Sequence, residues 1–151
     1  MKFSGKYTNT DYIEFDDDRA SAVFRDSKQP RVYKAFNPTR KNIKGYKVDG
    51  GIITSSLLEK CDYALYTEDD KIYLIELKGG DYKHAIDQIS SSVDILIKNV
   101  GVTAKEVNGR VVLSKCKTPS LWANDEKKLI AKLRRLGGNL DKKVRLLEEN
   151  I

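Results

Sequence analysis

A chain of 151 residues that is 40% hydrophobic and 33% charged has the composition of a soluble globular protein, and its length fits one domain spanning residues 1–151. No run approaches the roughly 20 apolar residues of a membrane helix, and the residues after Met1 lack the apolar core of a signal peptide. We therefore expect a cytoplasmic protein with no membrane partner. The two cysteines, Cys61 and Cys116, suit a reducing compartment, and one histidine, His84, disfavours a structural zinc site.

The net charge of +6 is unevenly distributed along the chain. Residues 25–47 carry eight basic side chains against one acidic, and residues 120–151 carry eight against five, whereas residues 48–119 carry nine against eleven. An acidic centre between basic segments is typical of a protein that grips a polyanion around a site rich in carboxylates. Solvated surface lysines produce the same pattern, so charge alone does not decide between these interpretations.

The first third of the chain predicts few regular elements. Residues 10–24 mix an acidic run with apolar positions and are predicted to form a helix. Residues 31–36 predict a short strand that ends at Asn37-Pro38, and the basic stretch from there to Lys47 is predicted to be a loop. Residues 52–53 predict a further short strand that leads to the centre of the chain.

Two apolar runs, residues 61–66 and 71–78, flank a polar segment and predict a β-hairpin. If Tyr66 faces Ile72 across the turn, the pairing continues down both strands. The second strand stops at Gly79-Gly80.

The predicted hairpin brings charged side chains together. In the register that pairs Tyr66 with Ile72, Asp62 falls opposite Glu76. Side chains two residues apart share one face of a strand, so Glu76 and Lys78 point the same way. Charges in an apolar strand are costly unless they have partners or a metal. The sequence therefore predicts a site made of these three residues, and a register slipped by one residue would break it.

From Asp81 the apolar residues recur at spacings of three and four, which predicts a helix with Asp81 as its N-cap and Gly101 as its stop. A second stripe of this helix holds His84, Gln88 and Ser92. These polar groups face either the hairpin carboxylates or solvent.

Residues 102–114 predict either a hairpin with its turn at Asn108-Gly109 or one strand after a loop. Thr118-Pro119 predicts the start of a helix that ends at Gly137-Gly138. The tail, residues 142–148, predicts an edge strand or a short helix. The expected fold is thus α/β, with a mixed β-sheet around a central hairpin flanked by helices.

The acid-x-Lys pattern at Glu76 is common in this chain, where seven such matches occur. Only the match at Glu76 lies in an apolar strand, follows a strand with a suitably placed aspartate and precedes a helix that carries a glutamine. The context, and not the three-residue pattern, therefore gives this match its meaning.

Residues 46–100 resemble the PD-(D/E)xK, restriction-endonuclease-like nuclease superfamily, whose core is a helix, three strands, a helix and a further strand. Asp62 matches the first acidic position, Glu76-Leu77-Lys78 match the acid-x-Lys element, and Gln88 matches a glutamine often found on the following helix. Cys61 stands where the family frequently has proline.

The resemblance implies hydrolysis of phosphodiester bonds with Mg²⁺, or Mn²⁺ as a substitute. It implies that Asp62, Glu76 and the carbonyl of Leu77 hold the metal, and that Lys78 orients water or stabilises the transition state. Gln88 would then position water or backbone. A further acidic ligand upstream is expected, and its candidates are Asp49, which we favour, Glu14, Asp17 and Glu59.

Nucleic acid, most plausibly DNA, is the expected partner, with RNA or a nucleotide left open as substrates. The expected contacts to it are made by Arg40, Lys41, Lys44, Lys47 and His84. Duplex cleavage by one small site would imply a homodimer. Two alternatives remain: a non-catalytic nucleic-acid-binding or protein-interaction module that retains the fold, and a purely structural ion pair between Glu76 and Lys78 with Asp62 as a cap.

Overall fold

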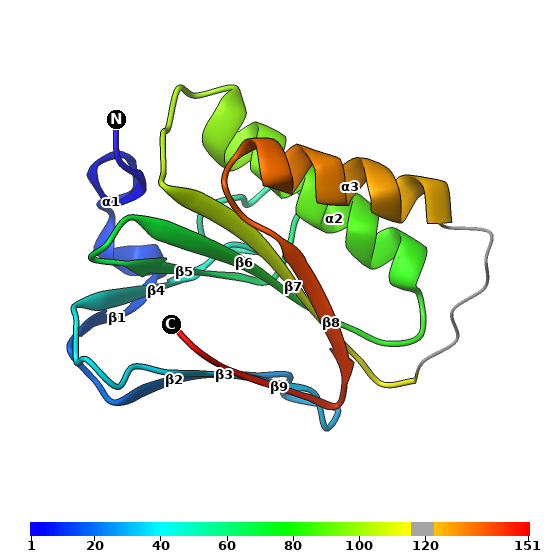
Figure 1. Cartoon of the computed structure of the whole chain (residues 1–151), viewed down its shortest axis with the longest axis horizontal. Coiled ribbons are helices and arrows are strands. Elements are labelled where there is room, and N and C mark those ends of the chain that lie inside the picture. Colours follow the sequence, from blue (N-terminus) through cyan, green and yellow to red (C-terminus); the bar gives the residue numbers. More distant parts are fainter. Residues whose placement is uncertain (116–122) are drawn as a thin grey trace.

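The computed structural model describes residues 1–115 and 123–151 and consists of three layers (Figure 1). A six-stranded mixed sheet lies in the middle, helices cover one of its faces, and a small three-stranded mixed sheet covers the other. The predicted mixed α/β class is confirmed. The helices, however, flank only one face of the main sheet.

The main sheet follows the spatial order β1 (Ile13–Asp17), β4 (Ile43–Lys47), β5 (Tyr63–Thr67), β6 (Lys71–Lys78), β7 (Glu106–Leu113) and β8 (Leu140–Val144). The first four strands pair with one another in antiparallel fashion, whereas β7 is parallel to both β6 and β8. The small sheet has the order β2 (Ser21–Arg25), β3 (Val32–Phe36) and β9 (Leu146–Asn150).

The helical layer contains α1 (Phe3–Lys6), α2 (Tyr82–Val93), a π-helical continuation η2 (Asp94–Lys98) and α3 (Ala123–Arg135). The prediction for α2 is confirmed, because the Asp81 side chain accepts a hydrogen bond from the backbone N–H of His84 and Gly101 follows with a φ of 72°. The predicted start of α3 at Thr118-Pro119 lies outside the described residues, while its end just before Gly137-Gly138 is confirmed. No helix among the described residues is long and apolar enough to cross a membrane.

The helix predicted over residues 10–24 is wrong. A short 3-10 helix η1 (Thr10–Tyr12) is followed there by strands β1 and β2. Phe15 in β1 and Phe24 in β2 are buried between exposed neighbours, which is the period-two pattern of strands with one buried face. The acidic residues between them obscured this alternation in the sequence.

The loop predicted up to Lys47 is also wrong, because β4 pairs with both β1 and β5. Gly45 disguises this strand, yet the glycine is required there, since a Cβ atom would collide with the ring of Phe15. The short strand predicted at residues 52–53 is reduced to one isolated bridge between Asp49 and Ile53.

The turn predicted at Asn108-Gly109 does not form, and β7 runs straight through both residues, which excludes the hairpin alternative. The Asn108 side chain donates to the carbonyl of Ile72 and accepts from the N–H of Asn139, so neighbouring strands satisfy it. A Cβ on Gly109 would lie 3.0 Å from Ile89 Cγ2, so the glycine lets α2 approach the sheet.

The C-terminal tail forms two strands, β8 and β9, one in each sheet. They join at Arg145, which has a φ of 67°, so the chain turns sharply from one sheet to the other. The prediction of one edge strand or a short helix for residues 142–148 therefore missed this connection.

Candidate active site

The predicted central hairpin is present with the predicted register over its paired length. Tyr66 lies opposite Ile72 and Tyr63 lies opposite Ile75. The regular ladder ends there, because the N–H of Asp62 donates to the carbonyl of Ile75 at 3.1 Å. Two successive residues are thus set against Ile75, as in a β-bulge. This offset replaces the direct Asp62 to Glu76 opposition that the sequence predicted.

Asp62 and Glu76 nevertheless meet at the end of the hairpin. The two carboxyl groups interact, because Asp62 raises the pKa of Glu76 and Glu76 lowers the pKa of Asp62. Oδ2 of Asp62 also accepts a hydrogen bond of 2.8 Å from the N–H of Leu77. The bulge therefore keeps the two acidic side chains together while it aims Asp62 at the end of β6.

Glu76 is the most perturbed carboxyl group of the site. Its side chain is on the helix-covered face of the main sheet and the residue is only 2% exposed. Burial, and secondly the charge of Asp62, raise the pKa of Glu76 to about 9, while Lys78 lowers it. Its Oε1 has no hydrogen-bond partner among the described residues. Such an orphaned oxygen is costly, and functional sites are one place where it is kept.

Lys78 ends β6 two residues after Glu76 and points to the same face. Its ammonium group lowers the pKa of Glu76, so the two side chains interact electrostatically. Within the described residues, Lys78 forms no ion pair and no side-chain hydrogen bond. The alternative of a structural ion pair between Glu76 and Lys78 is therefore not formed, although Asp62 does accept a hydrogen bond from a backbone N–H, as that alternative supposed.

Gln88 and Ser92 of α2 hold the segment that precedes Asp62. Nε2 of Gln88 donates to the carbonyl of Lys60 at 3.1 Å, and Oγ of Ser92 accepts from the N–H of Cys61 at 2.8 Å. Gln88 thus positions backbone, as the resemblance implies, and Cys61 is a buried free thiol. Two turns of α2 therefore fix where the strand carrying Asp62 begins.

Asp62 and Leu77 line a pocket of about 270 Å³, together with Lys47, Tyr63, Asp49 and three residues of the β2–β3 hairpin, Arg25, Asp26 and Ser27. Asp49, the favoured upstream acid, is 54% exposed and pairs with Lys60 at 3.8 Å. Its charge and that of Asp26 raise the pKa of Asp62, behind burial as the main cause. In the described part of the chain, no three His, Cys, Asp or Glu side chains form a group that could hold a metal ion.

His84 lies in a neighbouring pocket of about 210 Å³ that shares Asp49 with the first and also contains Gln88. Its Nε2 is 2.8 Å from Oε2 of Glu59, and both side chains are substantially exposed. Glu59 is therefore the partner of a histidine and not of Asp62. Glu14 lies in a third pocket with Arg19, and Asp17 pairs with Arg19, so neither joins the carboxylate pair.

The basic residues expected to bind nucleic acid are divided between the two ends of β4. Lys47 lies at the end that pairs with Tyr63 and lines the pocket of Asp62. Lys41 and Arg40 precede the opposite end of the strand. Sequence reasoning missed the β2–β3 hairpin as a wall of the site, because its residues lie far from the motif and carry no recognisable pattern.

Comparisons with protein-family models, with curated proteins and with solved structures found no match to this chain. The functional argument therefore rests on the site itself.

Proposed function

We propose that this chain is a metal-dependent nuclease that hydrolyses phosphodiester bonds in DNA on a restriction-endonuclease-like core. The observation that carries the proposal is the buried carboxyl of Glu76, with an oxygen that has no hydrogen-bond partner among the described residues, beside Asp62, which lines a pocket. A fold without a ligand gains nothing from a buried carboxyl group whose pKa is raised by desolvation and by a second carboxyl group beside it.

The order of helices and strands along the chain supports the proposed restriction-endonuclease-like core. Antiparallel strands β4, β5 and β6 are followed by α2 and then by β7, which is parallel to β6. The resembled family has three strands, a helix and a further strand in this order. The preceding helix of that core is replaced here by the short α1, with β1, β2 and β3 inserted before β4.

The donor set fits a magnesium ion. Mg²⁺ prefers oxygen ligands, keeps several waters and is often held by only one or two carboxylates together with substrate phosphates. Asp62 and Glu76 supply the carboxylates. The N–H of Leu77 points to Asp62, and in a strand the carbonyl of the same residue points to the same side, so this oxygen also faces the pocket.

The chain's own groups then have distinct tasks. When bound, a divalent cation polarises a phosphoryl oxygen and lowers the pKa of attacking water. Lys78 provides a positive charge without an ion-pair partner among the described residues, placed to stabilise negative charge that develops on the phosphate. Gln88 and Ser92 keep Asp62 in place through the backbone of Lys60 and Cys61.

The second candidate is a nucleic-acid-binding or protein-interaction module without catalysis. It is favoured by one observation: among the described residues no third acid joins Asp62 and Glu76 closely enough to complete a metal group. Nuclease activity tests the two proposals against each other.

The experiment incubates the protein with single-stranded, duplex and branched DNA and with RNA, in Mg²⁺ or Mn²⁺. We expect cleavage that falls by about 10²-fold or more in Glu76→Gln and in Lys78→Met, which is the usual scale for loss of a transition-state contact. Glu148→Gln and Lys105→Met change exposed residues outside the site and should cleave like the wild type. Binding without cleavage of any substrate would favour the module, and cleavage that survives Glu76→Gln and Lys78→Met would overturn the site.

A further inference from the structure

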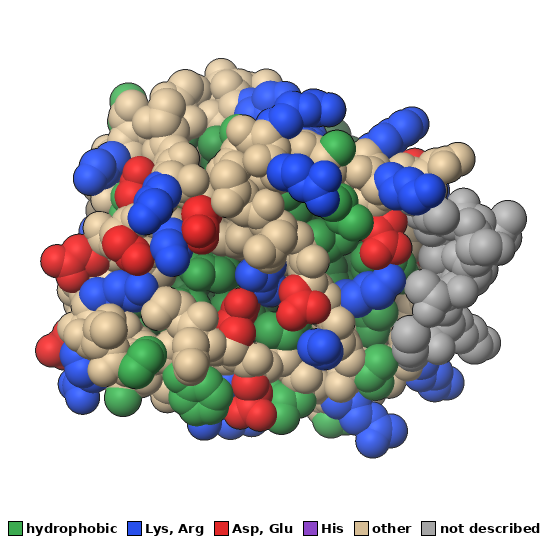
Figure 2. All heavy atoms as spheres, viewed as in Figure 1, with side chains coloured by type: hydrophobic (Ala, Val, Ile, Leu, Met, Phe, Trp, Pro, Cys, Tyr) green, Lys and Arg blue, Asp and Glu red, His purple; other side chains and the backbone are tan. Residues whose placement is uncertain are grey.

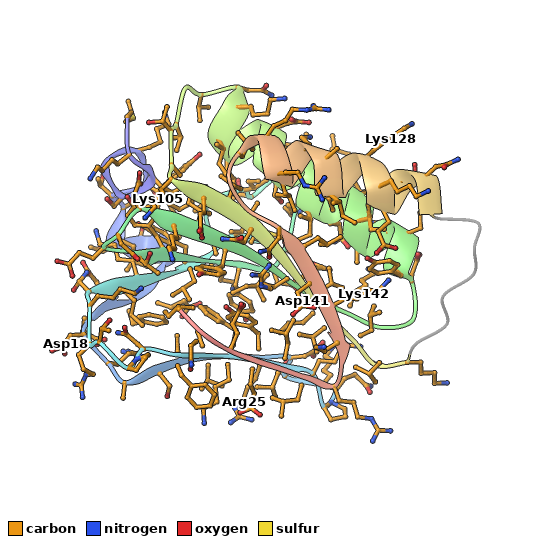
Figure 3. All side chains as sticks on the ribbon, viewed as in Figure 1. Asp18, Arg25, Lys105, Lys128, Asp141 and Lys142 are labelled. Atoms are coloured by element: carbon orange, nitrogen blue, oxygen red, sulfur yellow. The ribbon has the colours of Figure 1, made fainter. Side chains whose placement is uncertain are left out.

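The basic side chains at the end of the main sheet away from the carboxylates are neutralised by acids. Lys41 pairs with Asp69 at 3.2 Å and Lys44 with Asp16 at 3.5 Å. Arg40 pairs with Asp18 at 3.6 Å, and Asp18 lies at the left end of the molecule in Figure 3. Figure 2 shows acidic and basic side chains interleaved on this side. These three cations are therefore poorly placed to grip a polyanion.

The end that holds the carboxylates is different. Six basic side chains there form no ion pair and no side-chain hydrogen bond with any residue in 1–115 or 123–151. They are Arg25, Lys28, Lys47, Lys78, Lys115 and Arg145. In Figure 2 basic side chains project at the lower right of the molecule, where β8 turns into β9.

Hydrogen bonds between strand ends bring these residues to one edge. After Lys78, the carbonyl of Gly79 accepts from the N–H of Ser114, which precedes Lys115. The N–H of Arg145 donates to the carbonyl of Leu113 at 2.7 Å, and the carbonyl of Arg145 accepts from Val32 at 2.8 Å. The tip of the β2–β3 hairpin therefore lies next to the ends of β6, β7 and β8 in space.

Arg31 fixes this hairpin against the main sheet. Its guanidinium group pairs with Asp26 within the hairpin, and Nη1 donates to Oγ of Ser114 at 2.6 Å. The Arg31 side chain is only 11% exposed, so its bonds to Asp26 and Ser114 are largely shielded from water and connect the hairpin firmly to the main sheet. The Arg31 contacts thereby fix the hairpin whose residues Arg25 and Ser27 line the pocket that contains Asp62. Lys47 lines the same pocket.

We propose that the β2–β3 hairpin and the strand ends beside it form the DNA-binding surface, with Arg25 and Lys47 contacting phosphates at the pocket of Asp62 and Lys115 contacting a third phosphate beyond the end of β7. This inference deepens the proposed function and rests on it for the identity of the ligand. Unpaired cations bind phosphates without first breaking an ion pair, and each contact releases counterions from the nucleic acid. Arg25 and Lys47 line the same pocket as Asp62, so a phosphate backbone bound by these two cations passes next to Asp62.

Two triple variants with the same change in charge test the surface. One combines Arg25→Ala, Lys47→Ala and Lys115→Ala, and the matched control combines Arg40→Ala, Lys41→Ala and Lys44→Ala. Binding of fluorescent duplex DNA is measured by anisotropy without divalent cations, over a series of salt concentrations, with duplex RNA in a parallel arm. Thermal unfolding of each variant shows that the fold is retained.

We expect the first variant to bind at least about 10-fold more weakly, and its slope of log K against log salt to fall in magnitude by about 2.7, since each phosphate contact contributes about 0.9. The control should bind within about twofold of the wild type. Equal losses in both variants, unchanged binding in the first, or no binding of DNA or RNA by the wild type would overturn the surface.

The cleavage assay separates this inference from the proposed function. If the wild type binds DNA through the first set of residues but does not cleave it in Mg²⁺, the surface stands and the nuclease proposal fails. If the wild type cleaves and the first variant cleaves and binds equally well, the nuclease proposal stands and the surface is wrong. If the same residues bind RNA more tightly than DNA, the proposed surface is correct and its ligand is RNA.

Discussion

Glu76 is the residue on which the account depends most, since it is a carboxyl group with almost no access to water and with Asp62 beside it. A buried carboxyl group prefers its neutral form, so the folded protein binds a proton that the unfolded chain releases at ordinary pH. The folded state therefore carries a cost that a bound cation would remove.

This cost predicts how stability depends on pH. The pKa of Glu76 in the folded protein is about 9, above its ordinary value of 4.5. Below the ordinary value both states hold the proton, and as pH rises toward 9 the unfolded state loses it first, so stability falls. Between pH 5 and 9 we expect Tm to fall by about 4 °C or more without metal, since about 1 kcal/mol moves Tm by roughly 2–4 °C in a domain of this size.

The comparison of Glu76→Gln with Glu148→Gln by thermal unfolding checks this prediction. The first variant places a neutral amide where the folded protein holds a neutral acid, so the decline of Tm with pH should become shallower and the variant should be more stable than the wild type at pH 8. Glu148 is exposed and its variant should follow the wild type. If Tm of Glu76→Gln still falls steeply with pH, a group other than Glu76 causes the pH dependence.

At the scale of elements, the small sheet is held to the main sheet by a buried polar network. Nε of Arg110 in β7 donates to Oε2 of Glu149 in β9 at 2.7 Å, and the hydroxyl of Tyr33 in β3 donates to the same oxygen at 2.8 Å. The Arg110 side chain is 6% exposed. The network fixes β9 and β3 against β7, and thereby sets the position of the β2–β3 hairpin next to the site.

Removing the acid of this network should be costly. We expect Glu149→Ala to lower the free energy of unfolding by about 3–5 kcal/mol, because the buried Arg110 charge loses its counter-charge and keeps only hydrogen bonds to the carbonyls of Gly109 and Asn139. Its exposed neighbour provides the control, and Glu148→Ala should change stability by no more than about 0.5 kcal/mol. Urea unfolding measures both, and equal stabilities would mean that the network does not join the sheets.

The elements that the sequence predicted correctly are those with local signals. The β5–β6 hairpin and α2 are specified by turn length, strand alternation and the Asp81 cap, all within a few residues. For β7 the sequence left a hairpin and one strand after a loop open, and the single strand is the alternative that forms, because buried parallel pairing on both sides overrides the turn signal of Asn108-Gly109. The β-bulge at Asp62 was equally hidden, since nothing in the sequence marks where a ladder ends.

At the scale of the whole molecule, the division of charge was predicted only in part. The excess of basic residues in 25–47 was evident from the sequence, but which of them remain unpaired depends on acids from β1, the β1–β2 turn and the β5–β6 turn. Of Arg40, Lys41, Lys44 and Lys47, only Lys47 lines the pocket that contains Asp62. Contacts between distant segments therefore determine which basic residues remain unpaired, and composition alone does not show this.

The most direct test of the central claim is a count of Mn²⁺ ions bound at the carboxylate pair, measured by electron paramagnetic resonance as loss of the free-ion signal. The account predicts that the wild type and Glu148→Gln bind Mn²⁺ and that Glu76→Gln loses this binding, with a stronger interaction at higher pH as the carboxyl proton is displaced. A wild type that binds no Mn²⁺, or a Glu76→Gln variant that binds it as well as the wild type, would contradict the account.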